Sequence, residues 1–346
     1  MKKKKEKVEK DGLVSSLLKK VTRPVSDKLY DVSVAIHKRL PQKQKTGKQK
    51  RLGEAIFYWA VLAIPILQFL IMYVYVNIDS VLFAFQSYHR DAKTAEITVG
   101  WVGLDNFKLF VSEITGNELM LGRLKNSLIV YGVHLFVGTV LAILFAYYIY
   151  KGYTGANGFR VILMLPSILS SVVLVLIFKF IVEDAFPVLF KIPNLLAGSF
   201  NQRFWTIIAY NTFMGFGSGM LMYSNAMGRI PDSLVEYAKL EGCSPLREFW
   251  SITLPLIYPT VQTFLIIGLA AVFTDQANLF TFFSEQAPQQ LQTIGYYLYN
   301  TVFTERSDMT SYPYAAAAGL TLTAVTIPIV MIARVLLNKL DKGAEM

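Results

Sequence analysis

Polar residues inside apolar stretches are the first candidates for chemistry in this sequence. Asp275, Gln276 and Asn278 lie close together near the end of one apolar segment, and Tyr210 and Asn211 are adjacent in another. Such groups in membrane segments usually face a bundle interior or a water-filled cavity, where they form hydrogen bonds with a polar solute. They also form hydrogen bonds between helices. Both interpretations stay open: a solute path and helix–helix contacts.

Other reactive arrangements are not readable in the sequence. The three histidines, His37, His89 and His134, are too far apart for a metal-ligand motif, and no nucleophile and base occur at a recognisable spacing. His134 lies in an apolar segment and is a weaker candidate for the path. Cys243 is the only cysteine, so no intrachain disulfide is expected. The nucleotide-binding pattern G-x-x-x-x-G-K-[ST] is missing as well.

The composition is that of a membrane protein. Hydrophobic residues make up 53% of the 346 residues and charged residues only 17%, against about 25% in soluble domains. The mean hydropathy is +0.41. Several apolar runs reach the roughly 20 residues that a helix needs to cross a bilayer. We therefore expect an all-α integral membrane protein.

The net charge of +10 is concentrated at the N-terminal end. Residues 1–51 hold 17 lysines and arginines and 5 acidic residues, whereas the remainder has a slight acidic excess. Positive charge beside the first apolar run favours a cytoplasmic tail near anionic lipid headgroups, and no nucleic-acid partner is expected. The segment is too long and too basic for a signal peptide. Apolar residues at helical spacing from Leu13 to Leu40 predict an amphipathic helix, which lies on the membrane surface or packs on another subunit.

Six apolar segments follow the tail, and each is expected to form one transmembrane helix. They lie at 55–76, 127–150, 160–182, 204–225, 260–283 and 314–337. Basic residues in alternate connections place both termini in the cytoplasm. The expected organisation is a basic tail over 1–51, a six-helix membrane domain over 52–340 and a cytoplasmic C-terminus over 341–346.

The connection at 229–259, on the cytoplasmic side in this topology, has the pattern of two short helices joined by a tight turn. Ser233 and Glu236 match a capping box at the start of the first helix. Gly242 marks a helix stop where a left-handed conformation is needed.

The second helix of this connection is predicted to begin at Ser244-Pro245, an N-cap followed by proline at the first helical position. Pro255 and Pro259 are expected to end it and to lead into the fifth span. Apolar residues lie between the charges of both helices: Leu234, Ala238, Leu240, Leu246, Phe249, Trp250 and Ile252. A segment with this many apolar residues needs a surface to pack on, and we expect part of it to dock in a partner's groove.

Residues 236–259, EYAKLEGCSPLREFWSITLPLIYP, resemble the coupling loop of the permeases of binding-protein-dependent ABC importers. The family pattern is Glu-Ala-Ala-x-x-Asp-Gly-Ala, followed by Phe, Ile, Leu-Pro and Pro. Three positions depart from it: Tyr237 and Cys243 replace alanines, and Glu241 replaces aspartate. The residues that the resemblance implies in coupling to an ATPase are Glu236, Ala238, Glu241, Gly242, Phe249, Leu254 and Pro255.

The resemblance extends over about 55–340. Residues 102–107, VGLDNF, are similar to the external segment after the first span in the larger, maltose-importer-like permease subunits. Phe159-Arg160 and Leu165-Pro166 resemble the third span of that group. Residues 281–288, TFFSEQAP, replace the usual Leu-Thr-x-Gly-Gly-Pro after the fifth span, a departure in the region expected to set the preference for substrate or binding protein.

The resemblance implies a transport subunit of the plasma membrane of a bacterium, without its own ATPase or cofactor. Separate ATP-binding subunits would bind ATP and Mg²⁺, a second, different permease subunit would complete the pathway, and an extracytoplasmic sugar-binding protein would deliver the solute. In this setting Tyr210, Asn211, Asp275, Gln276 and Asn278 would hydrogen-bond sugar hydroxyls.

Two alternatives remain from the sequence: a proton-coupled secondary carrier, and an ABC importer permease for a solute other than a sugar. A proton-coupled carrier needs buried ionisable residues in several spans, and only Asp275 qualifies well. A membrane enzyme would need clustered carboxylates or a metal motif at one membrane face, and the sequence has neither.

Overall fold

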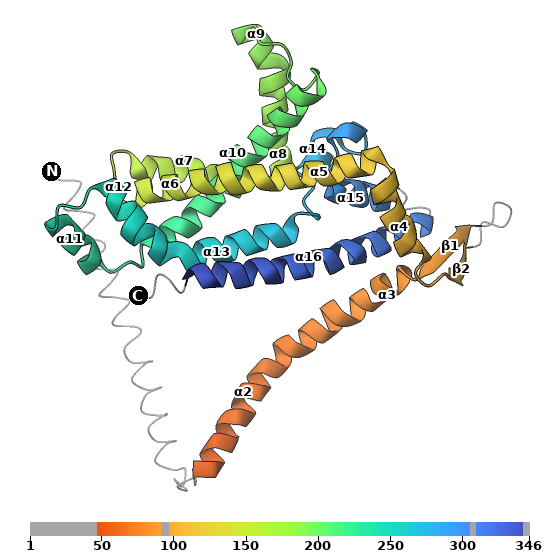
Figure 1. Ribbon diagram of the computed structural model, residues 1–346, viewed down its shortest axis with the longest axis horizontal. Coiled ribbons are helices and arrows are strands. Elements are labelled where there is room, and N and C mark those ends of the chain that lie inside the picture. Colours follow the sequence, from red (N-terminus) through yellow and green to blue (C-terminus); the bar gives the residue numbers. More distant parts are fainter. Residues whose placement is uncertain (1–46, 91–96, 305–308, 342–346) are drawn as a thin grey trace, which may run out of the picture. The chain divides into compact units, whose positions relative to one another are not determined.

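A computed structural model describes residues 47–90, 97–304 and 309–341 of the chain (Figure 1). By its internal contacts the chain divides into two compact units, Met1–Val74 and Tyr75–Met346. Helix α2, Gly47–Phe69, belongs to the first unit. The predicted amphipathic helix within 13–40 lies outside the described residues.

The first predicted span forms a longer helix than expected. Helix α2 continues through a π-helical turn, Leu70–Tyr75, into α3, Val76–Phe83. The stretch Glu54–Phe83 is long and apolar enough to cross a membrane, beyond the predicted end at residue 76.

A small hairpin follows, which the all-α expectation did not include. Strands β1, Gln86–Arg90, and β2, Ile97–Trp101, pair antiparallel, with Gln86 opposite Trp101. The side-chain amide of Asn106, at the start of α4 (Asp105–Gly116), donates to the carbonyl oxygens of Ala84 at 3.0 Å and Gln86 at 2.8 Å. This asparagine of the VGLDNF motif therefore joins the hairpin to α4.

The second span begins nine residues earlier than predicted, at Glu118 rather than 127. Helix α5 (Glu118–Val133), a π-helical turn (His134–Gly138) and α6 (Thr139–Tyr150) form one continuous stretch. Asn117 caps it by accepting from the backbone N–H of Leu119 at 2.9 Å. Because a π turn holds one residue more than an α turn, it changes which side chains face the neighbouring helices.

The third predicted span, 160–182, is not one helix. Helices α7 (Ala156–Ile168) and α8 (Ser171–Phe180) meet at a bend of 105°. Pro166 lacks the N–H that would continue the ladder, and Leu169 and Ser170 are extended, which ends α7. A π-helical turn, Ile181–Ala185, and α9, Phe186–Phe190, continue from α8 (Figure 1).

The fourth predicted span corresponds to α10, Phe200–Met227, which a capping box of Ser199 and Gln202 starts. Helix α10 packs along α6 and α7. Gly217 permits the approach of α7, because a Cβ atom there would lie 2.2 Å from the Leu163 carbonyl oxygen.

The fifth predicted span, 260–283, also differs. Helices α11 (Asp232–Leu240) and α12 (Pro245–Glu248) are followed by a π-helical turn (Phe249–Thr253) and α13 (Leu254–Ala271). Pro259 lies inside α13 rather than ending a helix, and α12 runs into α13 without interruption. The π turn ends two residues before Pro255, where a regular α-helical ladder would need the missing N–H. The helix ends at Ala271, twelve residues before the predicted boundary.

The remaining elements complete the second unit. Helix α14 (Leu279–Phe283), a 3₁₀ turn (Gln289–Leu291), helix α15 (Ile294–Thr304) and a second 3₁₀ turn (Met309–Ser311) precede the long α16 (Tyr312–Asp341). Helix α16 packs on α13 and α4, and α15 packs on α5. Tyr258 of α13 donates its hydroxyl to the Leu337 carbonyl of α16 at 3.0 Å.

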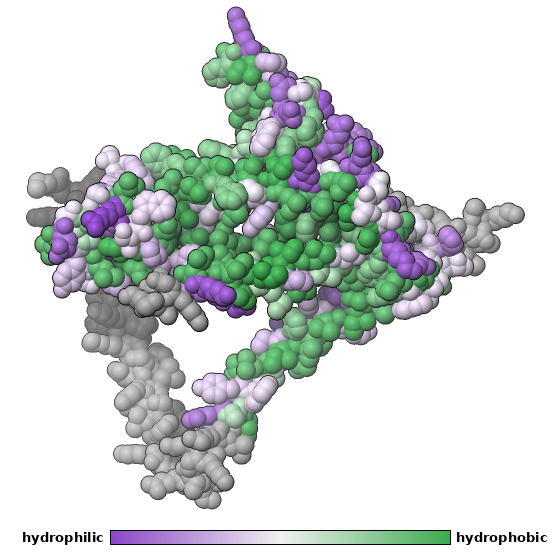
Figure 2. Space-filling view, viewed as in Figure 1, coloured by the Kyte–Doolittle hydropathy of each residue, from purple (hydrophilic) through white to green (hydrophobic). Residues whose placement is uncertain are grey.

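Among the described residues, four helical stretches are long and apolar enough to cross a membrane, and the bent α7–α8 pair raises the number to five. The chain is mostly helical. Helix α10 is long enough to cross a membrane but is not counted among these stretches. Figure 2 shows hydrophobic side chains covering the visible face of the second unit's helices, with hydrophilic ones gathered over α11 and α12 and at the opposite end. Such a distribution suits a bundle in lipid with polar ends in water.

Candidate functional site

Two asparagines connect α10 to the turn that follows α13. The Asn211 amide nitrogen donates to the carbonyl oxygens of Ile207 and Ala277, each at 2.9 Å, and the Asn278 amide donates to Asn211 Oδ1 at 2.5 Å. Ala277 and Asn278 have positive φ values of 49° and 55°. Asparagine tolerates this region better than most residues. Asn211 therefore holds a strained turn in place through its side chain.

Asp275 lies beyond the end of α13, in the same turn, and not inside a helical span as predicted. Its carboxylate accepts from the Ala277 backbone N–H at 2.8 Å, and its backbone carbonyl accepts from the Thr293 hydroxyl at 2.9 Å. The side chain is exposed. A carboxylate that bonds its own backbone two residues on forms an Asx turn, which competes with continuation of the helix.

Four of the five predicted path residues line one cavity of 330 Å³: Tyr210, Asn211, Asp275 and Asn278. Gln276 is not among the lining residues. The other walls come from α5, the α7–α8 bend and α10, including Val130, Pro166, Ser171 and Gly215. The fold thus brings together two segments that are more than 60 residues apart in the sequence.

Tyr210 is 3% exposed and packs its ring between two others. The ring centroid of Phe178 lies 4.8 Å away and that of Phe282, in an edge-on arrangement, 5.1 Å away. Tyr210 is therefore both a lining residue and part of the aromatic packing between α8, α10 and α14.

His134 has the most central position of the candidate residues, although sequence reasoning ranked it low. It begins the π-helical turn of the second span and lines three cavities, of 330, 450 and 200 Å³. The 450 Å³ cavity is lined mainly by glycines and apolar residues of α6, α10 and α13, and the 200 Å³ cavity is shared with Asp275. Its only sequence signal was an imidazole in an apolar segment.

Helix α11 ends as the sequence predicts. The Cys243 N–H donates to the Ala238 carbonyl at 2.9 Å and the Gly242 N–H to the Lys239 carbonyl at 3.0 Å, with Gly242 at φ +69°. These two bonds form a Schellman motif, whose left-handed residue is usually glycine. The predicted N-cap of the second helix is also confirmed, since Ser244 Oγ accepts from the Arg247 N–H at 3.4 Å.

The capping box predicted for Ser233 and Glu236 is wrong. Helix α11 begins at Asp232 after Pro231, so Ser233 already lies in the first turn and no side chain caps this end. Glu236 is exposed on α11 without a capping role.

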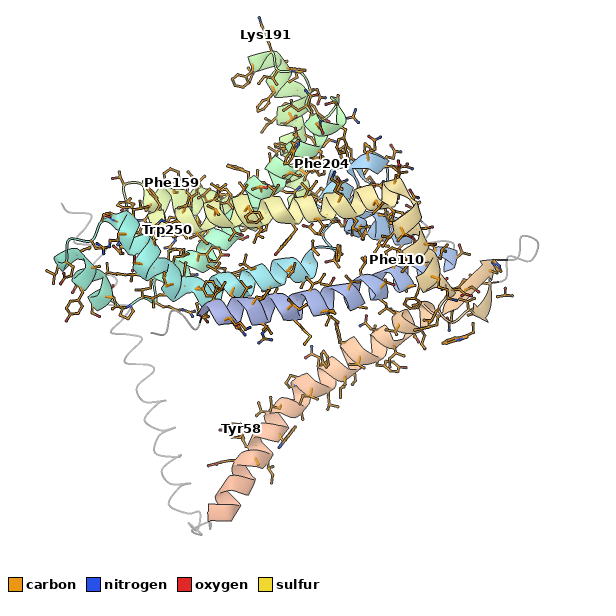
Figure 3. The ribbon with its side chains drawn as sticks, viewed as in Figure 1. Tyr58, Phe110, Phe159, Lys191, Phe204 and Trp250 are labelled. Carbon is orange, nitrogen blue, oxygen red and sulfur yellow. The ribbon has the colours of Figure 1, made fainter. Side chains whose placement is uncertain are left out.

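The predicted coupling residues divide between two faces of the loop. Glu236, Glu241 and Gly242 are exposed, Ala238 and Phe249 are buried, and Leu254 and Pro255 are half-buried. The exposed apolar side chains of the loop are Leu234, Tyr237, Leu240, Leu246 and Trp250, with Leu240 83% exposed. Trp250 lies at the α12 end of the bundle, away from Phe110 at the other end (Figure 3). The loop therefore presents an apolar surface with the exposed carboxylates of Asp232, Glu236 and Glu241 at one end of the second unit.

Comparison with known proteins decides the family. Residues 138–345 match the model of the binding-protein-dependent transport system inner membrane component. The chain belongs to this family. The resemblance seen in the sequence is thereby confirmed, and the chain is an inner-membrane component of a transport system.

Two relatives match this permease over most of their own length. The multiple sugar-binding transport system permease protein MsmF of Streptococcus mutans is 22% identical over 291 residues, which cover 81% of this chain and 94% of that protein. The sn-glycerol-3-phosphate transport system permease protein UgpA of Agrobacterium fabrum is 26% identical over 216 residues, 60% of this chain and 72% of that one. A crystal structure of a bacterial alginate ABC transporter in complex with an alginate pentasaccharide-bound periplasmic protein contains a chain of the same fold, with a TM-score of 0.68 and 23% identity. The match covers 85% of this chain and 98% of that one.

Proposed function

We propose that this chain is one of two different permease subunits of an ABC importer that carries a sugar or oligosaccharide. A binding protein outside the cell delivers the solute, and separate ATP-binding subunits, which hold ATP and Mg²⁺, drive the transport. The permease crosses the membrane six times, with α10 as the fourth span, and both termini lie in the cytoplasm. The six-span arrangement puts the α11–α12 loop on the cytoplasmic side, where the ATPase is.

The exposed surface of α11 and α12 is the observation that carries this proposal. Leu240 and Leu246 are more than two-thirds exposed, and Gly242 holds the sharp turn between the two helices. Exposed apolar side chains in a short rigid loop are typical of a docking surface. The family pattern falls on these residues, so the partner is inferred to be the ATP-binding subunit.

A neutral solute fits the cavity residues better than an anionic one. The exposed Asp275 lines two of the three cavities that His134 also lines. No lysine or arginine occurs among the described residues that line the three cavities. A phosphate or a uronate would meet an unbalanced negative charge there, whereas hydroxyl groups can hydrogen-bond to the carboxylate and the amides. We therefore infer a neutral carbohydrate.

Reconstitution tests this function. Proteoliposomes containing the complete complex, supplied with its binding protein, are expected to take up labelled neutral oligosaccharides only when the ATPase has ATP and Mg²⁺. A protonophore should leave this uptake unchanged. Inhibition by the protonophore with ATP present would instead favour the proton-coupled carrier, and uptake of glycerol phosphate but no sugar would favour a non-sugar importer.

Replacement of Asp275 separates its charge from its hydrogen bond. Asparagine can still accept from the Ala277 N–H and close the turn, whereas alanine cannot. A lost hydrogen bond of this kind is worth about 0.5–1.5 kcal/mol. We expect Asp275→Ala to raise the KM for uptake several-fold and Asp275→Asn to stay near wild type, with ATPase assembly unchanged in both. An equal loss in the two variants would mean that the charge itself is required.

A further inference from the structure

A buried ion pair joins the end of α6 to α12. The Lys151 ammonium, in the connection after α6, donates to both carboxylate oxygens of Glu248, the last residue of α12. Their side chains are only 12% and 4% exposed. The other ion pair of the described residues, Lys108 with Asp105, is 75% and 69% exposed. Lys151 and Glu248 thus differ from an ordinary surface pair.

Tyr147, one turn before Lys151 on α6, strengthens the same junction. Its hydroxyl donates to the Pro245 carbonyl at 2.8 Å, and its ring lies edge-on to Phe249 with centroids 4.9 Å apart. The Lys151 ammonium is 5.6 Å from the centre of the Tyr147 ring. The start and the end of α12 are therefore both attached to the last turn of α6.

Helix α6 connects this junction to the cavities. Helix α6 has 12 residues, which gives a length of about 18 Å. It continues into the π-helical turn that carries His134, which lines all three cavities. A displacement of α12 would move the end of α6 and, through one stiff helix, the wall of the solute path. The covalent route through α13 reaches two of these cavities at Gly268.

Stability alone does not account for an ion pair at this position. Buried ion pairs contribute little net stability compared with apolar side chains of similar volume, because both charges lose their water. They do define which groups must meet, since either partner left alone is a buried uncompensated charge. The pair therefore suits an interface that must hold one register while force passes through it.

We propose that Lys151 and Glu248 are positioning residues that lock α12 to α6, so that movement of the ATPase-docking loop is passed to the His134 wall of the path. This inference rests on the proposed function of the α11–α12 loop. Because Glu248 is buried, it acts inside this chain and not at the ATPase surface.

The test compares single variants with a charge exchange in the reconstituted complex. Lys151→Met and Glu248→Gln are each expected to lower the number of solute molecules taken up per ATP hydrolysed by about tenfold, within the range of typical coupling between two sites. ATP hydrolysis itself should continue. The double exchange, Lys151→Glu with Glu248→Lys, restores the pair in reverse and should recover most of the ratio. Lys108→Met, at the exposed pair, is the matched control and should leave the ratio unchanged.

Three results would overturn the inference. The first is an unchanged uptake-to-ATP ratio in both single variants. The second is a parallel fall of uptake, ATP hydrolysis and thermal stability, which shows a merely structural role. The third is failure of the double exchange to recover the ratio when the single variants have lost it. Failure of the proposed function is seen separately, because the wild-type complex would then show no ATP-dependent uptake at all.

Discussion

Gly242→Val is expected to separate ATP hydrolysis from solute uptake. Gly242 has φ +69° and no atom within 4 Å of the position of a Cβ atom, so the substitution meets open space but a strained backbone. A residue with a Cβ loses about 1–2 kcal/mol in this conformation, and a β-branched one fits it worst. The turn between α11 and α12 would relax, and the proposed docking surface would change shape.

The measurement is uptake and ATP hydrolysis in the same proteoliposomes. We expect uptake to fall by about tenfold, since 1.4 kcal/mol corresponds to a factor of ten, while hydrolysis persists. Insertion should stay intact because Gly242 is exposed and lies outside the candidate spans. Gly242→Asn is the control, because asparagine adopts the left-handed region more readily and should keep most of the uptake. Normal coupling in the valine variant would remove Gly242 from the coupling unit.

Gly217→Ala is expected to weaken the packing of the helix bundle more than Gly242→Val does. A Cβ atom at this position of α10 would lie 2.2 Å from the Leu163 carbonyl oxygen and 3.2 Å from its carbonyl carbon in α7. A backbone atom cannot move away as a side-chain end can, so the two helices must separate. Small residues that permit close helix contact are a main source of packing in membrane bundles, and overpacking costs about 1–3 kcal/mol or more.

Gly219→Ala is the matched control, two residues away on the same helix. Its Cβ would be 3.5 Å from the Ala142 Cβ, an ordinary contact distance. Thermal unfolding of the purified permease in detergent should show a lower midpoint for Gly217→Ala and little change for Gly219→Ala. Equal midpoints in the two variants would contradict the close approach of α7 to α10.

The α11–α12 loop was the part most readable from the sequence, because its signals are local. The positive φ of Gly242 and the Ser244 cap depend on residues a few positions away. The family pattern fell on the same segment. The start of α11 was misjudged, because Pro231 and Asp232 began the helix one residue before the supposed cap at Ser233.

The lengths of apolar runs were a poorer guide to where helices break. Two predicted spans, 160–182 and 260–283, are mainly apolar, but their helices stop at Ile168 and Ala271. The first break follows Pro166 by a few residues. The second depends on the Asp275 turn, on Asn211 of another helix and on the close approach of Gly295 to the Thr274–Asp275 backbone. Hydropathy carries no information on such contacts.

The sequence by itself determined the membrane class, the family and the helix–turn–helix of the α11–α12 loop, because composition and short-range spacing encode them. Tertiary structure decided which polar residues meet: Asn211 with Asn278, His134 with three cavities, and Lys151 with Glu248. Helix packing brings these groups together. Lys151 and Glu248, for example, are 97 residues apart in the sequence. Long-range side-chain contacts depend on how helices cross and rotate. The residue types and their spacing in the sequence do not specify this geometry.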